Sequence, residues 1–160
     1  MIIRDILNLK GSTIFSVAPD GRVADAVAIM VQNDIGSLVV MASGRMVGML
    51  TFREVLKGLH ARHGNLGDLP VAEVMVKDPL TCKADDTSEI LRELMTGHHV
   101  RYVPVQEDGK LLGVISFHDI AKAAIKEASF ENRLLKRYIK NWPEGESAPA
   151  PGAEPAKGQG

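Results

Sequence analysis

The stretch Gly113-Val114-Ile115-Ser116-Phe117-His118-Asp119 reads as the end of a buried strand followed directly by the start of a helix. Its apolar run ends in a hydroxyl residue, and an aspartate follows three positions later, in the first turn of the predicted helix. A second copy, Gly48-Met49-Leu50-Thr51-Phe52-Arg53-Glu54, lies 65 residues upstream. At the same offset, residues 19–58 align with residues 84–123 without a gap. The identical pairs in this alignment are Asp20/Asp85, Met30/Met95, Val40/Val105, Gly44/Gly109, Gly48/Gly113, Phe52/Phe117 and Lys57/Lys122.

A gapless repeat of this length predicts two copies of one supersecondary unit. Each copy is too small to be more than marginally stable alone, so the two are expected to share a core. The periodicity predicts the order β-α-β-β-α in each copy, hence an α/β (α+β) fold with small, mostly antiparallel, three-stranded sheets. The predicted elements are strands 13–17, 37–41 and 45–51 with helices 23–31 and 53–60, then strands 80–82, 101–105 and 111–116 with helices 87–95 and 117–127.

Two details of the helices are predicted as well. Asp86 or Thr87 is placed to cap the helix at 87–95. The helix at 53–60 is expected to turn Val55, Leu56 and Leu59 inward.

The remaining segments fall outside the two repeats. The predicted division is an N-terminal helix within 1–11, repeats 12–62 and 74–127, a linker 63–73 with one helical turn, a C-terminal helix 128–142 and a disordered tail 143–160. The C-terminal helix carries an apolar stripe from Phe130 to Trp142. That stripe needs a second surface, which is either the chain's own core or another subunit.

Composition restricts the function. The 160 residues carry a formal net charge of −1, which argues against a basic nucleic-acid surface or a polybasic membrane patch. No apolar run approaches the roughly 20 residues that cross a bilayer, and the N-terminus lacks signal-peptide architecture. The single cysteine, Cys82, excludes an internal disulfide and suits a reducing compartment, so we expect a soluble cytoplasmic protein. No metal site is expected at His98-His99, since adjacent residues in a turn point apart.

A tandem β-α-β-β-α unit with Gly-apolar-apolar-Ser/Thr-x-x-Asp at its third strand resembles a pair of CBS domains, the cystathionine-β-synthase-type repeats of a Bateman module. The second strands, Val100–Val105 and Asp34–Val40, strengthen the resemblance to stand-alone bacterial members, which covers residues 12–127. It implies a non-catalytic regulatory module that binds an adenine nucleotide in clefts between the repeats. AMP is the first expectation, with ATP, ADP, NAD(H) or S-adenosylmethionine as alternatives. It also implies a homodimer that signals to an unknown regulated protein, with no nucleic-acid or membrane partner.

Asp119 is the first candidate for ligand binding, because its two oxygens can accept from both hydroxyls of a ribose. Ser116 lies beside a helix N-terminus, where its hydroxyl and the backbone N–H groups can bind a phosphate. The structural alternatives are a first-turn carboxylate that stabilises the helix dipole for Asp119 and an N-cap for Ser116. The other candidates in this cleft are Thr81, Lys83, Arg101, Tyr102 and Pro104 beside the base, with Arg101 and His118 as phosphate partners.

The first repeat departs from the family pattern, because Glu54 stands where the second repeat has aspartate. Its longer side chain would misplace the ribose contact, so this cleft is expected to be empty, weaker or used for another part of the ligand. Thr51 matches Ser116, Arg53 could supply charge for a phosphate, and Ser16 with Ile35–Val39 would line the base pocket. The departure also keeps open an alternative function, a structural dimerisation module with degenerate pockets.

Overall fold

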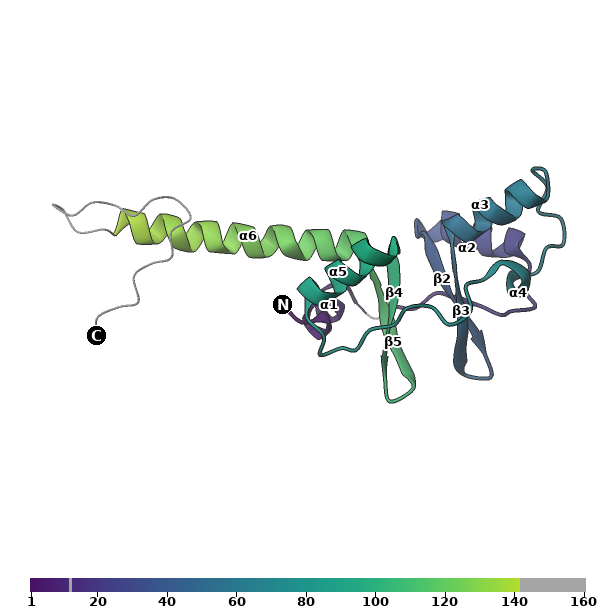
Figure 1. Cartoon of the computed structure of the whole chain (residues 1–160), viewed down its shortest axis with the longest axis horizontal. Coiled ribbons are helices and arrows are strands. Elements are labelled where there is room, and N and C mark those ends of the chain that lie inside the picture. Colours follow the sequence, from purple (N-terminus) through teal and green to yellow (C-terminus); the bar gives the residue numbers. More distant parts are fainter. Residues whose placement is uncertain (12, 142–160) are drawn as a thin grey trace. The chain divides into compact units, whose positions relative to one another are not determined.

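The computed structural model of the chain describes residues 1–11 and 13–141 (Figure 1). Trp142 and the predicted disordered tail 143–160 lie outside the described residues, as does Ser12. The chain divides into two compact units, residues 1–121 and 122–160, and both repeats up to the first turn of the last helix belong to the first unit. No helix in the described part of the chain is long and apolar enough to cross a membrane.

The first repeat has the predicted β-α-β-β-α order. Its elements are β1 (Ser16–Val17), α2 (Val23–Asn33), β2 (Ser37–Ala42), β3 (Arg45–Thr51) and α3 (Phe52–Ala61). The sheet order is β1-β2-β3, with β1 parallel and β3 antiparallel to β2. Ser37 lies opposite Thr51, so the start of the middle strand and the end of the third strand meet at one edge.

Apolar spacing explains how this repeat packs. α2 buries Val23, Ala26 and Met30, and β2 is buried along Leu38–Val40, as expected for a strand covered on both faces. The prediction that Leu56 turns inward is wrong, because 59% of it is exposed. α3 instead buries Glu54 and Gly58, one turn apart, and Leu56 lies on the other side of the helix.

The second repeat comprises α5 (Ser88–His98), β4 (Tyr102–Glu107), β5 (Lys110–Ser116) and the start of α6 (Phe117–Lys140). Its sheet has two strands, because the predicted strand at 80–82 is reduced to one parallel bridge between Cys82 and Val105. Cys82 nevertheless exchanges two backbone hydrogen bonds with β4, one from its N–H to Pro104 and one to its carbonyl from Gln106. Thr87 caps α5 by accepting from the N–H of Ile90 at 3.2 Å.

The last helix differs from the prediction. The sequence analysis separates a helix at 117–127 from another at 128–142, whereas α6 runs without a break from Phe117 to Lys140. The residues at the predicted boundary, Ala128 and Ser129, include no proline or glycine, so nothing in the sequence stops the helix there.

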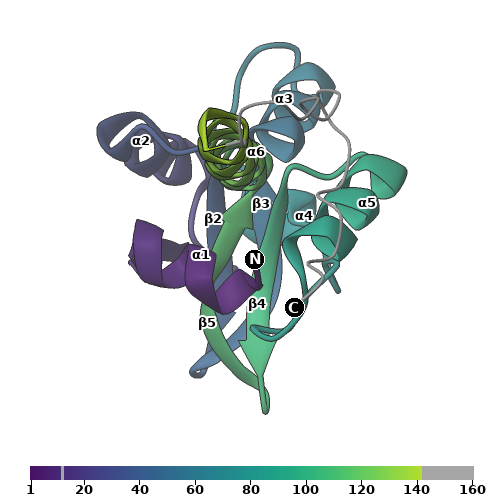
Figure 2. The same ribbon diagram turned by 90° about the vertical axis from the view of Figure 1, so that its left-hand side faces the viewer.

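Two short helices occupy equivalent places in the two repeats. The N-terminal α1 (Ile3–Lys10) and α4 (Val71–Val74) overlap at the 65-residue offset, so α1 is the counterpart of α4. α1 packs against β5 of the second repeat, as Figure 2 shows. The Cβ atom of an alanine at Gly113 would lie 2.8 Å from Leu7, so this glycine permits the close packing of α1 on β5.

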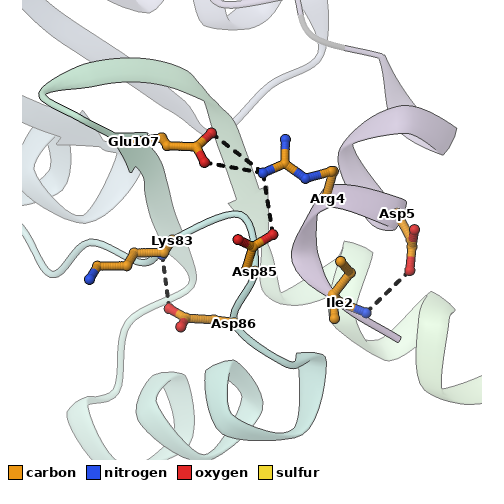
Figure 3. A network of polar contacts seen from close by, with 7 residues as sticks. All are labelled: Ile2, Arg4, Asp5, Lys83, Asp85, Asp86 and Glu107. Carbon is orange, nitrogen blue, oxygen red and sulfur yellow. Dashed lines mark hydrogen bonds and ion pairs between the residues drawn. The ribbon is translucent and has the colours of Figure 1, made fainter.

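Backbone pairing and ion pairs hold α1 on the second repeat. Ile3 donates its N–H to the carbonyl of Asp86 at 2.9 Å, and Arg4 donates to Ala84 at 2.8 Å. Figure 3 shows the Arg4 guanidinium between Asp85 and Glu107, 3.3 and 3.2 Å away. These ion pairs are exposed and stabilise the structure little, so the backbone bonds and the burial of the apolar face of α1 fix its position.

Candidate functional site

The two strand-to-helix junctions lie in equivalent environments. Phe52 donates its N–H to the carbonyl of Gly36 at 3.0 Å, and Phe117 donates to Arg101 at 2.7 Å. Each helix start is thereby tied to the chain just before the middle strand of its own repeat. Because β3 contacts β5, both junctions are brought to the boundary between the repeats.

A large cleft of about 1100 Å³ opens at this boundary. One wall comes from the second repeat, at the end of β5 and the start of α6. The other comes from the first repeat, including the segment that leads from α1 to β1 and the turn after α2. The lining residues that carry polar or charged side chains are Lys10, Thr13, Asp34, Ser37, Arg53, Thr96, His99, Arg101, Tyr102, Ser116 and His118. Its volume is slightly above the typical range of small-molecule sites, about 300–1,000 Å³.

Ser116 and Asp119 form a reciprocal cap at the start of α6. Asp119 donates its N–H to the Ser116 hydroxyl at 3.0 Å, and Ser116 donates its N–H to Asp119 Oδ2 at 2.8 Å. Both structural alternatives considered for these residues, the cap and the first-turn carboxylate, are therefore realised. The backbone bond of this cap uses one carboxylate oxygen, Oδ2.

A lysine in the last turn of α1 also contacts Asp119. Lys10 donates from Nζ to Asp119 Oδ2 at 2.7 Å and to the carbonyl of Val114 at 2.7 Å. The Asp119 side chain is only 15% exposed and lies behind Lys10, which lines the cleft itself. Burial alone would raise the pKa of the Asp119 carboxyl, but the bonds from Lys10 and from the Ser116 backbone hold it below its usual value.

The equivalent cavity at the other junction is much smaller. It measures about 70 Å³, enough for about two water molecules at about 30 Å³ each. Phe52 and Tyr102 meet edge to face here, with ring centroids 6.3 Å apart, and the Arg101 guanidinium lies 5.6 Å from the Phe52 centroid. These side chains occupy space that a ligand would need.

Glu54 has only local partners among the described residues. It is 8% exposed and accepts from the Thr51 N–H at 2.8 Å and from the Thr51 hydroxyl. Its burial shows that Glu54 is not a plain surface charge. At the position equivalent to Lys10 the chain has Met75, which offers no charge to this carboxylate.

The predicted site residues are placed as follows. The large cleft is lined by Arg53, Arg101, Tyr102, Ser116 and His118, and the small one by Thr51, Arg53, Glu54, Arg101 and Tyr102. Among the described residues, neither lining includes Asp119, Ser16, Thr81, Lys83 or Pro104. Pro104 is buried within β4, whereas Ser16, Thr81 and Lys83 are exposed to solvent.

The lining of the large cleft combines segments that the sequence analysis assigns to different clefts. The sequence analysis places the ends of the second repeat's own strands opposite Asp119. In the structure, the segment Thr13–Phe15 and the turn Asp34–Ser37 of the first repeat face the Ser116 side. The cause is the docking of α1 on the second repeat, which carries the following chain across the cleft on its way to β1. Pro79 and Leu80 take the equivalent course along the small cavity.

Sequence reasoning missed Lys10, Thr13, Asp34 and His99. Asp34 and His99 are equivalent residues that end α2 and α5 in the left-handed conformation, at φ values of 51° and 54°. Their 65-residue offset was visible, and it could have marked both as paired turn residues beside the strands. No local pattern distinguishes Lys10.

The sequence pattern that defines the CBS domain matches the chain twice, over residues 3–61 and 71–126. The chain belongs to the CBS-domain family. The two matches begin in α1 and α4, which agrees with the equivalence of these helices. Its fold is the tandem CBS pair that the sequence predicts.

Individual relatives agree with this assignment. The CBS domain-containing protein YhcV of Bacillus subtilis is 29% identical over 119 residues, which cover 74% of this chain and 82% of YhcV. The crystal structure of the CBS-domain containing protein ATU1752 from Agrobacterium tumefaciens matches 78% of this chain and 99% of its own, with a TM-score of 0.75 and 32% identity. The CBS domain pair of protein MJ0100, solved with 5′-methylthioadenosine and S-adenosyl-L-methionine, is 20% identical, covers 79% of this chain and 98% of its own, and has a TM-score of 0.70. At that identity the likeness shows the fold alone.

Other reactive groups give no sign of chemistry. Within residues 1–11 and 13–141, no group of three or more His, Cys, Asp or Glu side chains could hold a metal ion. Cys82 is buried, and burial raises the pKa of its thiol to about 12, far from the low value of an activated thiolate.

Proposed function

We propose that this protein is a non-catalytic regulatory module that binds one adenine nucleotide in the large cleft. The observation that carries this proposal is the composition of the cleft in a CBS pair. Lys10, Arg53 and Arg101 line it together with two histidines, whereas Asp34 is the one carboxylate among the described lining residues. Such a surface suits a ligand with a phosphate.

AMP is the first candidate, and ADP, ATP and NAD(H) share its adenosine and phosphate groups. The MJ0100 pair, which holds adenosine-containing ligands, supports adenosine as the common part, although it does not identify the ligand here. Apolar residues of the first repeat, Ile14, Phe15 and Ile35, could stack on a base. Ser116 and His118 would then lie toward the sugar and phosphate.

Regulation would follow from the position of the cleft. A ligand there touches both repeats, so it can bias their packing, provided that it binds two arrangements with different affinity. The change would pass to a second subunit or to a regulated protein. Large apolar residues on three helices support self-association, since Val31, Leu56 and Ile90 are 75, 59 and 51% exposed.

Calorimetric titration with AMP, ADP, ATP and NAD(H) tests the proposal. We expect one of these to bind, and Asp119→Ala to weaken that binding by about 1–3 kcal/mol, the scale of a lost hydrogen bond to a charged group. Unchanged affinity in the variant would remove Asp119 from the site. If none of the four binds, the function moves to the alternative, a structural dimerisation module, which the filled small cavity and the exposed apolar residues favour. Light scattering would then have to show a dimer.

A further inference from the structure

We propose that Lys10 makes the large cleft selective for ligands that carry a negative charge, a role that rests on the proposed function. Lys10 covers Asp119 in the ligand-free protein. When ribose hydroxyls replace Lys10 at the Asp119 carboxylate, the Lys10 ammonium group moves to the ligand's phosphate. A ligand without an anionic group displaces Lys10 but gives it no new partner.

The hydrogen bonds of Asp119 require this displacement. Oδ2 already accepts from the Ser116 N–H at 2.8 Å and from Lys10 Nζ at 2.7 Å, which uses both of its lone pairs. Neither of these two donors reaches Oδ1. A single hydroxyl can therefore bind at Oδ1, but a ribose that contacts both oxygens must remove the lysine from Oδ2.

The surroundings make the removal costly unless the charge is satisfied again. The Asp119 side chain is 15% exposed and that of Lys10 is 35% exposed, so the carboxylate is shielded from water although the ammonium group remains accessible. Losing a hydrogen bond to a charged group in such a place corresponds to a loss of about 10- to 100-fold in affinity. A phosphate in the cleft would restore a charged partner, because Lys10 lines the same cleft as Arg101 and His118.

The rest of the molecule fixes Lys10 in this position. α1 is held by backbone hydrogen bonds from Ile3 and Arg4 and by the buried side chains of Ile6 and Leu7. Lys10 then lies in the last turn of α1, beside β5, where it also donates to the carbonyl of Val114. A lysine that only stabilised the dipole of α1 would not need acceptors on β5 and α6, whereas Lys10 donates to Val114 and to Asp119.

Comparison of the repeats gives an internal control. Met75 is the residue equivalent to Lys10, and it accompanies Glu54 and a cavity of only about 70 Å³. The lysine is thus found only beside the cleft that is large enough for a nucleotide. Lys10→Met therefore places at one junction the residue that the chain itself uses at the other.

The test compares AMP with adenosine, which lacks the phosphate, by calorimetry on the wild-type chain, Lys10→Met and Lys57→Met. Lys57 is an exposed lysine of α3 outside both linings, so its variant controls for the loss of one charge. We expect the wild type to prefer AMP and Lys10→Met to reduce that preference at least about tenfold. Adenosine should bind more tightly to the variant and AMP more weakly, while Lys57→Met should keep the wild-type ratio.

The outcomes separate this role from the proposed function. A ratio that Lys10→Met leaves within about twofold, with AMP bound, overturns the role of Lys10 and leaves the nucleotide site standing. Adenosine binding to the variant but not to the wild type would support the displacement. Failure of AMP and adenosine, and of ADP, ATP and NAD(H), to bind either protein overturns the nucleotide site, and the role of Lys10 falls with it.

Discussion

Each chain is expected to bind one nucleotide, although the fold contains two equivalent junctions. Asp119→Asn and Glu54→Gln remove the same charge at the two junctions and preserve side-chain shape. Both carboxylates cap a helix by accepting a backbone N–H at 2.8 Å, so both variants should lose a similar amount of stability, about 1–2 kcal/mol. Only Asp119 lies beside a cleft of ligand size, so only its variant should lose affinity.

The expected loss at Asp119 follows from the hydrogen bonds between its carboxylate and a ribose. Hydrogen bonds to a charged group contribute about 1.5–3 kcal/mol, so their loss should raise the dissociation constant roughly 10- to 150-fold. Glu54→Gln should leave affinity unchanged, because its cavity of about 70 Å³ lies far below the roughly 300 Å³ of the smallest typical ligand sites.

Calorimetry at a protein concentration well above the dissociation constant measures both affinity and stoichiometry, and urea unfolding measures stability. We expect one ligand per chain, roughly equal destabilisation of the variants, and weakened binding only for Asp119→Asn. Two ligands per chain would refute the reasoning, since it would require the Phe52–Tyr102 contact to open. Equal loss of affinity in both variants would refute it as well, because the effect would then come from the helix caps.

Three further predictions concern stability and reactivity. Gly36→Ala should destabilise the fold by about 1–3 kcal/mol, since its Cβ would lie 2.1 Å from the Tyr102 hydroxyl oxygen. In a double-mutant cycle measured by urea unfolding, Tyr102→Ala should recover part of that loss. Additive effects of the two substitutions would contradict this clash. Cys82 should react with iodoacetamide only after unfolding, because its thiol is 5% exposed with a pKa of about 12; rapid labelling of the native chain would be inconsistent with this burial. The pKa of Asp119 is lowered in the folded chain, so this carboxylate stabilises the fold at pH values above its pKa in the unfolded chain. The stability advantage of the wild type over Asp119→Asn, measured by urea unfolding, should therefore shrink below about pH 4. A constant difference down to about pH 3 would argue against the pairing with Lys10.

The repeat and its elements could be predicted because their signals are local. Strand ends, turns and helix starts recur at a fixed offset, and the junctions at Thr51 and Ser116 fall where the sequence places them. The missing strand at Cys82 was not predictable in the same way. A single residue still exchanges two hydrogen bonds with β4, but too few residues pair to form a ladder.

The lining of the cleft could be predicted only in part, because it depends on how distant segments cross. Ser116 and His118 follow from the motif, whereas Lys10 reaches the cleft only because α1 packs on the second repeat instead of the first. Nothing local in the first eleven residues specifies that choice. It follows from the fit of Leu7 beside Gly113, a contact between residues more than one hundred positions apart.

A duplicated unit can thus yield one binding cleft and one packed contact with few substitutions. At one junction Lys10 and Asp119 form an ion pair beside an open cleft. At the other, Met75 and Glu54 stand in the same places, and Tyr102 reaches across to Gly36 and Phe52. The packed junction joins the repeats without a ligand, so only the open one is left to respond to a ligand. A second open cleft would require this contact to be lost, because Tyr102 fills the space beside Gly36.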